Sequence, residues 1–440
     1  MNPTRFCCSA QLARTLLLTA CFTGTFVAAT SAESGSSAGK PALPKIEKQF
    51  IVFPESVVLE QWPHTLKLVN APQDLKLLNP GQCVRLGILA TGDNRDSFLE
   101  QTQIAFRAEF AGQKQDYPMA QLAATKQIKP EGGDFVTQAL AAANIDNPLK
   151  TVASMGASAA NWCVPADARD GTVTIDADVE SPSGHEKLEQ MTIPVESFDT
   201  GSKRAFADAD EFEKFSMGFH YQPNPARLYP AMQFFVAKVA SREHPESFMD
   251  FAAMAGAALK ANPEAAKDFT ARLTSENNLS VKGVGLIVLK IGGYDIEPVL
   301  KPMSDDAKKA FGDSEFPDPY DFSLPEDVAM RFDMLWGMFT TAGQFAPIQK
   351  ISSALAWRSD WEDFDKARKS ANPPHEWTPA IGRAVAYGAA GWSLSSFQQT
   401  DPLAADYIEE LIALPDTPEV VKSELKVLQT DPAFRREEKK

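Results

Sequence analysis

The spacing of the apolar residues changes once along this chain, near residue 200, and this change limits the folds open to it. In the stretch GTVTIDADVES (171–181), apolar side chains occupy every second position, which is the period of a β-strand. Beyond residue 200, apolar residues recur every three or four positions, which is the period of an α-helix. We therefore predict a two-domain protein, β first and α second.

The first region, residues 46–200, is expected to be an antiparallel β-sandwich of immunoglobulin-like type. Its strand-like segments have one apolar and one polar face, and turns between them are frequent. An Ala-rich stretch at 119–160 is expected to interrupt the sandwich as an insertion. The predicted strands cover residues 49–61, 64–70, 82–90, 102–110, 171–181 and 186–198.

The second region, residues 205–430, is expected to be an all-α, helical-repeat domain of solenoid-like form. Two apolar stripes with helical spacing lie 100 positions apart in it, which hints at a duplicated unit. These stripes consist of Leu228, Met232, Phe235, Val236 and Val239, and of Val328, Phe332, Leu335, Trp336 and Phe339. Start signals such as Asn262-Pro263 and Asp401-Pro402 mark further helices. These are predicted at 246–260, 263–274, 279–291, 345–357, 378–397, 402–413 and 417–428.

Two segments of the helical region carry a resemblance to known sequences: FHYQPNPARLYPAMQFF (219–235) and FDMLWGMFTTAGQFAPIQKI (332–351). The pattern is an aromatic helix start with Pro-x-Pro, then a Trp-x-x-Phe-x-x-Thr-Gly helix end. In this chain, Thr341-Ala342-Gly343 lengthens that ending by one residue. The pattern resembles a helical region of uncharacterised exported bacterial proteins and covers about half of the helical region. The resemblance implies an α-solenoid-like fold and carries no known activity.

Residues 1–32 are predicted to be a secretory signal peptide, followed by a flexible leader at 33–45. Arginines precede an apolar run, TLLLTACFTGTFVAATSA, that ends in small residues at Ala32, the expected cleavage site. Thr, Gly and Ser dilute this run, so no transmembrane segment is expected. The stretch LTAC also fits a lipobox, which would leave Cys21 as the acylated first residue. We therefore expect an exported protein, periplasmic or extracellular, with a lipoprotein as the alternative.

The charge of the chain bears on its partners. Its formal net charge is −15 at pH 7. Nucleic acid and anionic lipid are therefore not expected as partners, since phosphate groups would repel it. The short tail at 431–440 is charged but mixed in sign.

Two of the five cysteines, Cys83 and Cys163, lie beyond the predicted signal peptide. In an exported protein, two cysteines most simply form one disulfide. The alternatives are a buried pair of free thiols, or a thiol nucleophile, which would need a nearby His.

The alternation around Cys83 predicts on which face of the sheet that bridge lies. One face carries the core residues Val84, Leu86, Ile88 and Ala90, and Cys83 belongs to the other face with Arg85. We expect the bridge to pin the 119–160 insertion onto the outside of a sheet.

Five residues of the helical region are candidate binding residues: His220, Tyr221, Trp361, His375 and Trp377. Both histidines lie at predicted helix starts, and a shared face with the tryptophans would form a ligand-binding rim. The alternative interpretation is that these residues have no binding role and that the histidines pack at helix ends. Under it, the cluster of Trp336, Trp357, Trp377 and Trp392 lies in the core, while Trp361, in a polar stretch, is exposed.

Two acidic stretches could hold a cation but are better explained as connections. GDSEFPDPYDF (312–322) contains hard oxygen ligands for Ca²⁺, yet its prolines and the lack of loop spacing favour a solvated linker. TGDNRD (91–96) is predicted to be a turn. Neither a metal nor a cofactor is expected.

No catalytic signature is recognised in the sequence, so the leading hypothesis is an exported, non-enzymatic binding or scaffold protein. Its helical-repeat surface would engage a protein or peptide partner. The alternatives are a secreted hydrolase with a site near His220 and His375, and a lipid-anchored envelope component.

Overall fold

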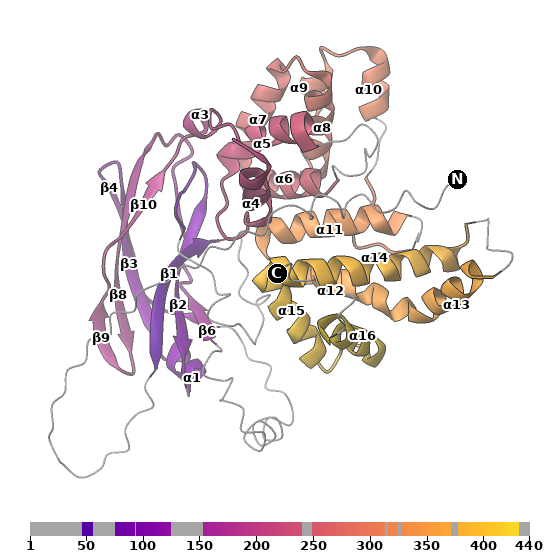
Figure 1. Cartoon of the computed structure of the whole chain (residues 1–440). Coiled ribbons are helices and arrows are strands. Elements are labelled where there is room, and N and C mark those ends of the chain that lie inside the picture. Colours follow the sequence, from indigo (N-terminus) through magenta and orange to yellow (C-terminus); the bar gives the residue numbers. More distant parts are fainter. Residues whose placement is uncertain are drawn as a thin grey trace, which may run out of the picture.

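The computed structural model describes residues 46–55, 75–92, 94–124, 153–239, 249–312, 316–323, 327–370 and 377–430. In these ranges, antiparallel sheets come first and helices follow, as the apolar spacing predicts (Figure 1). The predicted signal peptide, the leader, the strand at 64–70, Cys21, His375 and the tail at 431–440 lie outside the described residues.

Strands of the described region form two antiparallel sheets. The first has the order β1-β2-β6-β5, with β7 paired to β2, and the second has the order β10-β8-β3-β4, with β9 paired to β8. Helix α1 (Arg95–Glu100) follows β2. The strands are β1 Glu47–Pro54, β2 Cys83–Thr91, β3 Gln103–Phe110, β4 Gln113–Gln121, β5 Ala123–Ala124, β6 Ala153–Ala157, β7 Trp162–Cys163, β8 Gly171–Ser181, β9 Gly184–Lys187 and β10 Met191–Val195.

The apolar faces of both sheets belong to one hydrophobic cluster. The alternating residues of β2 and β8 are buried in it, which confirms the faces predicted from sequence. The members from these two strands are Val84, Leu86, Ile88, Ala90, Val173, Ile175, Ala177 and Val179. In Figure 1 the first sheet lies between the second sheet and the helices.

The ends of the range 119–160, predicted to be an insertion, are strands of the sheets, so the prediction is wrong there. β4 pairs with β3 over Gln113–Gln121, and β6 pairs with both β2 and β5. β4 carries no apolar alternation because it is an edge strand whose side chains are mostly exposed. β6 has the small-residue sequence ASMGA, in which Gly156 lies against Leu122 and Leu99.

The structure contains the predicted disulfide between Cys83 and Cys163. β7 places the two cysteines directly opposite each other across the β2–β7 pair. Cys163 is exposed whereas the preceding Trp162 is buried, so the bridge lies on the face away from the shared core, as the alternation predicts. The bridge ties β7 to the first residue of β2.

The helical region agrees closely with the predicted helices, and Asn262 and Asp401 cap α7 and α15 as expected. A 3₁₀ turn precedes α5, a π-helical turn follows it, and another 3₁₀ turn joins α12 to α13. The helices are α3 Phe198–Gly201, α4 Ala209–Met217, α5 Leu228–Phe234, α6 Met249–Ala261, α7 Pro263–Ser275, α8 Leu279–Ile291, α9 Glu297–Leu300, α10 Asp305–Gly312, α11 Val328–Ala342, α12 Phe345–Ser353, α13 Arg358–Arg368, α14 Pro379–Thr400, α15 Pro402–Ala413 and α16 Glu419–Thr430.

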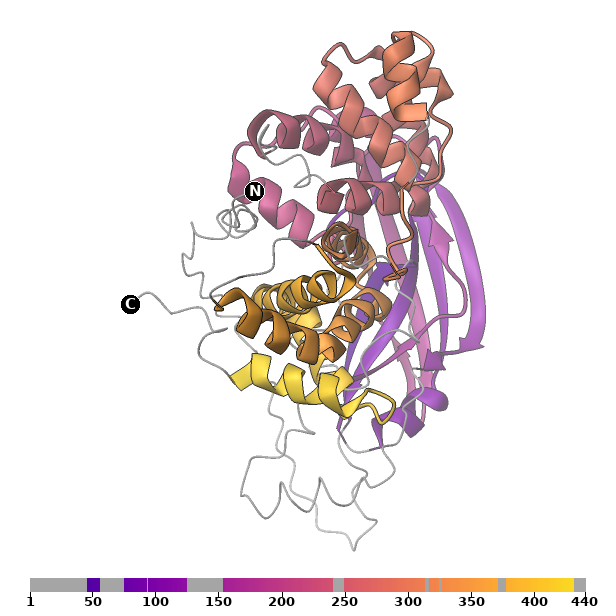
Figure 2. The same ribbon diagram turned by 90° about the vertical axis from the view of Figure 1, so that its right-hand side faces the viewer.

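Two hydrophobic clusters divide the helices into two lobes. We call α4–α10 the first lobe, whose cluster spans residues 206–300, and α11–α16 the second lobe, whose cluster spans 328–428. The lobes lie one above the other beside the sheets (Figures 1 and 2). All five residues of the stripe at 328–339 are buried in the second cluster, as predicted.

The lobes meet where α6 crosses α11 at very short range. Gly337 makes this possible, because a Cβ there would lie 2.3 Å from the Asp250 carbonyl oxygen and 2.7 Å from the Met254 nitrogen. One turn later, the Thr341 hydroxyl donates to the Met254 carbonyl oxygen at 2.9 Å.

Candidate functional site

Two buried polar side chains of the helical region, His220 and Asp401, meet the partly buried Tyr221 at one place. His220 and Tyr221 precede the 3₁₀ turn Pro225–Arg227, and Asp401 stands between α14 and α15. The His220 Nε2 atom lies 3.4 Å from the Asp401 Oδ2 atom, and the Tyr221 hydroxyl donates to Asp401 Oδ1 at 3.2 Å. We call these three residues the His–Asp–Tyr cluster.

Asp401 is held in place by its role as the N-cap of α15. Its carboxylate accepts from the backbone nitrogens of Leu403 (2.9 Å) and Ala404 (3.3 Å), so Asp401 caps the helix that Pro402 begins. Gly343 ends α11 in the left-handed conformation (φ 61°), and a Cβ there would lie 3.1 Å from the His220 ring. The helix end that the resemblance emphasises therefore forms one wall of the cluster.

Burial shifts the pKa values of His220 and Tyr221 in this cluster. The His220 and Asp401 side chains are each only 3% exposed. Burial lowers the pKa of His220, and the charge of Asp401 and the Thr340 carbonyl oxygen only partly oppose it. Burial also raises the pKa of Tyr221, with Asp401 adding to the effect. The cluster is thus a closed contact that ties the start of the first lobe to the second.

Three tryptophans, Trp361, Trp377 and Trp392, are not where the sequence places them. Trp361 was expected to be exposed, but it is half-buried, since its ring packs near Tyr387 and against Gly388 of α14. Trp377 and Trp392 were expected in the core, yet they are 50% and 46% exposed. The core prediction is confirmed for Trp336.

A second cluster of polar contacts joins the sheets to the helices, and sequence reasoning missed it. We call residues 75–82, which run up to β2, the junction segment. Asn79 is fully buried, and its amide donates to the Glu196 carbonyl oxygen at 2.8 Å. The Asn79 side-chain oxygen accepts from the Ala226 nitrogen at 3.4 Å.

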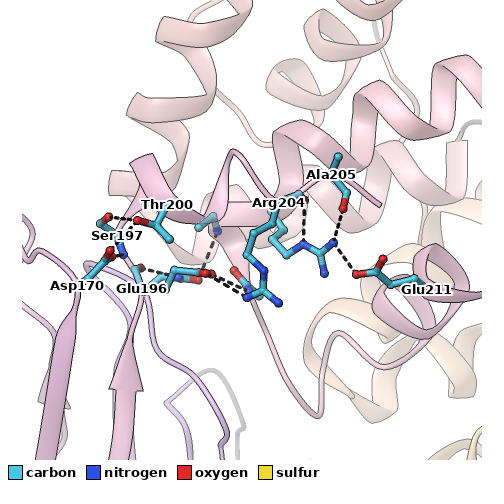
Figure 3. A network of polar contacts seen from close by, with 11 residues as sticks. Asp170, Glu196, Ser197, Thr200, Arg204, Ala205 and Glu211 are labelled. Atoms are coloured by element: carbon cyan, nitrogen blue, oxygen red, sulfur yellow. Dashed lines mark hydrogen bonds and ion pairs between the residues drawn. The ribbon is translucent and has the colours of Figure 1, made fainter. Parts of the chain in front are cut away.

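Charged residues continue this network into the helices, as Figure 3 shows. Arg204 donates to the Glu196 carboxylate at 3.1 Å, and Arg227 donates to Glu211 at 2.8 Å. Arg227 also stacks on the Phe206 ring, with its guanidinium carbon 3.9 Å from the ring centroid. No single stretch of sequence reveals this network because its members are far apart along the chain.

Next to this network, the Asp170 carboxylate holds the start of α3. It accepts from the Ser197 nitrogen at 2.7 Å and from the Thr200 hydroxyl at 2.6 Å (Figure 3). These hydrogen bonds, with that of Thr200 the strongest, lower the pKa of Asp170.

The described part of the acidic stretch 312–322 is held against the second lobe by Arg331. This side chain donates to the Asp318 carbonyl oxygen at 2.7 Å and to that of Asp321, and it is only 3% exposed. Asp318 and Asp321 accept from backbone nitrogens two residues ahead, which is the geometry of turns. These contacts fit a linker.

Among the residues that the structure describes, no group of three or more His, Cys, Asp and Glu side chains is placed to hold a metal ion. In the same residues, no helix combines the length and the apolar character needed to cross a bilayer. Comparison of the chain with protein-family models and with curated proteins gave no match.

Proposed function

We propose that this is an exported, non-enzymatic binding or scaffold protein that engages a protein or peptide partner through its helical region. The observation that carries the proposal is the exposure of two tryptophans of the second lobe, Trp377 and Trp392. Tryptophan buries a large apolar area on binding and is enriched among the residues that dominate protein interfaces.

Two further exposed apolar side chains belong to the second lobe. Trp377 directly precedes the N-terminal residues of α14, and Trp392 lies in the middle of that helix. Helix α16 packs against α14 and exposes Val420 and Val427, each to 39%. A partner with aromatic or aliphatic anchor residues would suit such a surface.

The finer features of the fold belong to the same proposal. We infer an immunoglobulin-like sandwich from the single hydrophobic cluster that both sheets share. A repeat-like, solenoid character of the helices is supported by two successive lobes, each with its own hydrophobic cluster. The disulfide supports export, since such bridges persist in oxidising compartments.

The hydrolase alternative has weaker support. A general base must reach its substrate or a water molecule, but the His220 side chain is enclosed by Phe339, Gly343 and Asp401. The second histidine of that hypothesis, His375, lies outside the described residues. For the lipid-anchored alternative, mass spectrometry of the mature protein would distinguish a chain that begins at Cys21 from one that begins near Glu33.

Photo-crosslinking in living cells tests the proposed surface. A benzophenone amino acid would replace Trp377 or Trp392 and, as a control, Glu180 on the exposed face of β8. We expect a discrete cross-linked partner from both tryptophan positions and none from position 180. The same cross-linking pattern from all three positions would contradict the proposal.

A double variant checks that the tryptophans supply affinity. Trp377→Ala combined with Trp392→Ala should weaken binding of the cross-linked partner at least tenfold, because loss of a tryptophan that dominates an interface costs about 2 kcal/mol. Circular dichroism should stay unchanged, since neither residue is in the core.

A further inference from the structure

We propose that the Cys83–Cys163 disulfide is a redox-sensitive latch on the joint between the sheets and the helices. Reduction of the bridge would loosen this joint while leaving the second sheet intact. The proposal rests on the position of the bridge relative to the junction segment, and it is independent of any partner.

Both cysteines of the bridge lie next to the junction segment. Cys83 directly follows this segment, and Cys163 directly precedes Val164, which holds the segment by two backbone hydrogen bonds. The Gly81 nitrogen donates to the Val164 carbonyl oxygen at 3.1 Å, and the Val164 nitrogen donates to that of Gln82 at 2.9 Å. The bridge thus fixes the strand against which the segment is held.

Besides the Asn79–Ala226 contact described above, the junction segment bonds to the helical region through Gln222, Pro223 and Asn262. The Lys76 nitrogen donates to the Gln222 side chain at 2.8 Å, and the Gln82 side chain donates to the Pro223 carbonyl oxygen at 3.2 Å. The Asn262 side chain, at the start of α7, donates to the Pro80 carbonyl oxygen at 3.1 Å. A change in the conformation of this segment would therefore affect its contacts with the turn before α5 and with the start of α7.

Strand β7 pairs with β2 over a short ladder, next to the two Val164 hydrogen bonds, and Trp162 and Val164 are buried in the shared core. Its ladder with β2 consists of Cys83 opposite Cys163 and Val84 opposite Trp162. Such a short pairing at the end of a strand is prone to local opening unless a covalent bond prevents it. The disulfide supplies that bond, and its loss should raise the open population locally.

The exposure of Cys163 makes the bridge accessible to a dithiol reductant. A thiolate of the dithiol attacks the Cys163 sulfur, the S–S bond breaks, and Cys83 leaves as a thiolate that takes up a proton. The second thiol of the reductant then attacks the mixed disulfide, which frees Cys163 as a thiol. The dithiol ends as a cyclic disulfide, having supplied two electrons and two protons.

Hydrogen–deuterium exchange of the oxidised and the dithiothreitol-reduced protein tests the latch. We expect reduction to accelerate exchange at the amides of Lys76, Gly81 and Val164 at least tenfold more than at the paired amides within β3 and β8. The variant with Cys83→Ser and Cys163→Ser should show the fast rates without reductant and no further response to it.

A control separates a local latch from general destabilisation. Val179→Ala removes apolar contacts that β8 makes in the shared hydrophobic cluster and leaves the bridge in place. This variant should accelerate exchange in β3 and β8 at least as much as at the amides of Lys76, Gly81 and Val164. If reduction left the junction amides unchanged, or accelerated both groups of amides equally, the bridge would be an ordinary staple and the proposal would be wrong.

Discussion

At the scale of single residues, the His–Asp–Tyr cluster shows how burial overrides a residue's usual chemistry. A histidine beside a carboxylate is commonly a proton acceptor at a catalytic site. His220 is instead kept neutral, because the cost of burying its charge exceeds the attraction of Asp401. Its ring serves as a packing surface for Tyr221 and Phe339.

Replacing His220 by Asn should change how stability depends on pH. Because the folded pKa lies below the ordinary value of 6.5, the unfolded chain takes up a proton first as the pH falls. The wild-type free energy of unfolding should therefore decline as the pH falls below about 6.5, and this decline should be smaller in His220→Asn. Urea unfolding at pH 7.5, 6.5 and 5.5 measures both curves; parallel curves would rule out the assigned role of burial.

Two substitutions of Asp401 test its contacts, since only one of them keeps a side-chain oxygen at this position. Asp401→Ala removes the cap of α15 and the partner of the Tyr221 hydroxyl, at about 1 kcal/mol for each contact. Asp401→Asn keeps a side-chain oxygen for both contacts and should cost less than about 1 kcal/mol. Equal losses in chemical denaturation would contradict the assigned contacts.

At the scale of helices and strands, local chemistry decided what the sequence could predict. Asn262 and Asp401 each precede a proline, so the starts of α7 and α15 were readable from a few adjacent residues. Strand β4 was missed because its position at the edge of a sheet requires no apolar alternation.

Trp392 of α14 shows a different limit of sequence-based prediction. Helical spacing can identify an amphipathic face, but α14 packs on neighbours from several directions and contains small residues throughout. Whether Trp392 faces a neighbour or solvent depends on where α13 and α16 lie, and no local pattern encodes that. The same holds for His220 and Asp401, which the fold brings together from 181 positions apart.

The α6–α11 crossing should be very sensitive to one methyl group. Gly337→Ala would place a Cβ against the backbone of α6, which cannot move without shifting the helix. We expect it to lower the free energy of unfolding by about 1–3 kcal/mol. Gly388→Ala is the matched control, since its Cβ would meet only the ring edge of Trp361 at 3.2 Å. That substitution should be neutral or stabilising by up to about 1 kcal/mol, and equal effects in urea unfolding would argue against close helix contact as the cause.

At the scale of the whole molecule, polar contacts around the junction segment tie the sheets to the first lobe, whereas the two lobes meet at the close contact between α6 and α11 and at the His–Asp–Tyr cluster. Asn79 bonds to the end of β10 and to the first lobe, while Leu78 pairs with Val195. Separating the sheets from the helices would exchange these buried hydrogen bonds for hydrogen bonds to water, at a net cost of about 1 kcal/mol for each bond.

Gly81→Ala should weaken this joint, and Gly112→Ala provides a reference for it. Both glycines have positive φ (77° and 79°), so the backbone strain of an alanine is similar at the two sites. Only at position 81 would the Cβ also meet the helical region, 3.1 Å from both Asn262 Oδ1 and Glu264 Cγ. Gly81→Ala should therefore lower the free energy of unfolding, measured with urea, by more than Gly112→Ala does. Equal losses would show that the contact between Gly81 and the helical region is not tight.

Two turns of this protein, the β8–β9 hairpin and the junction segment, should differ in whether they tolerate an inserted sequence. The hairpin between β8 and β9 is exposed, and a side chain at Gly184 would meet nothing within 4 Å. An epitope tag placed after Ser183 should therefore leave the protein soluble and antibody-accessible. The same tag placed after Pro80 would disconnect the sheets from the helices, although both sites are turns.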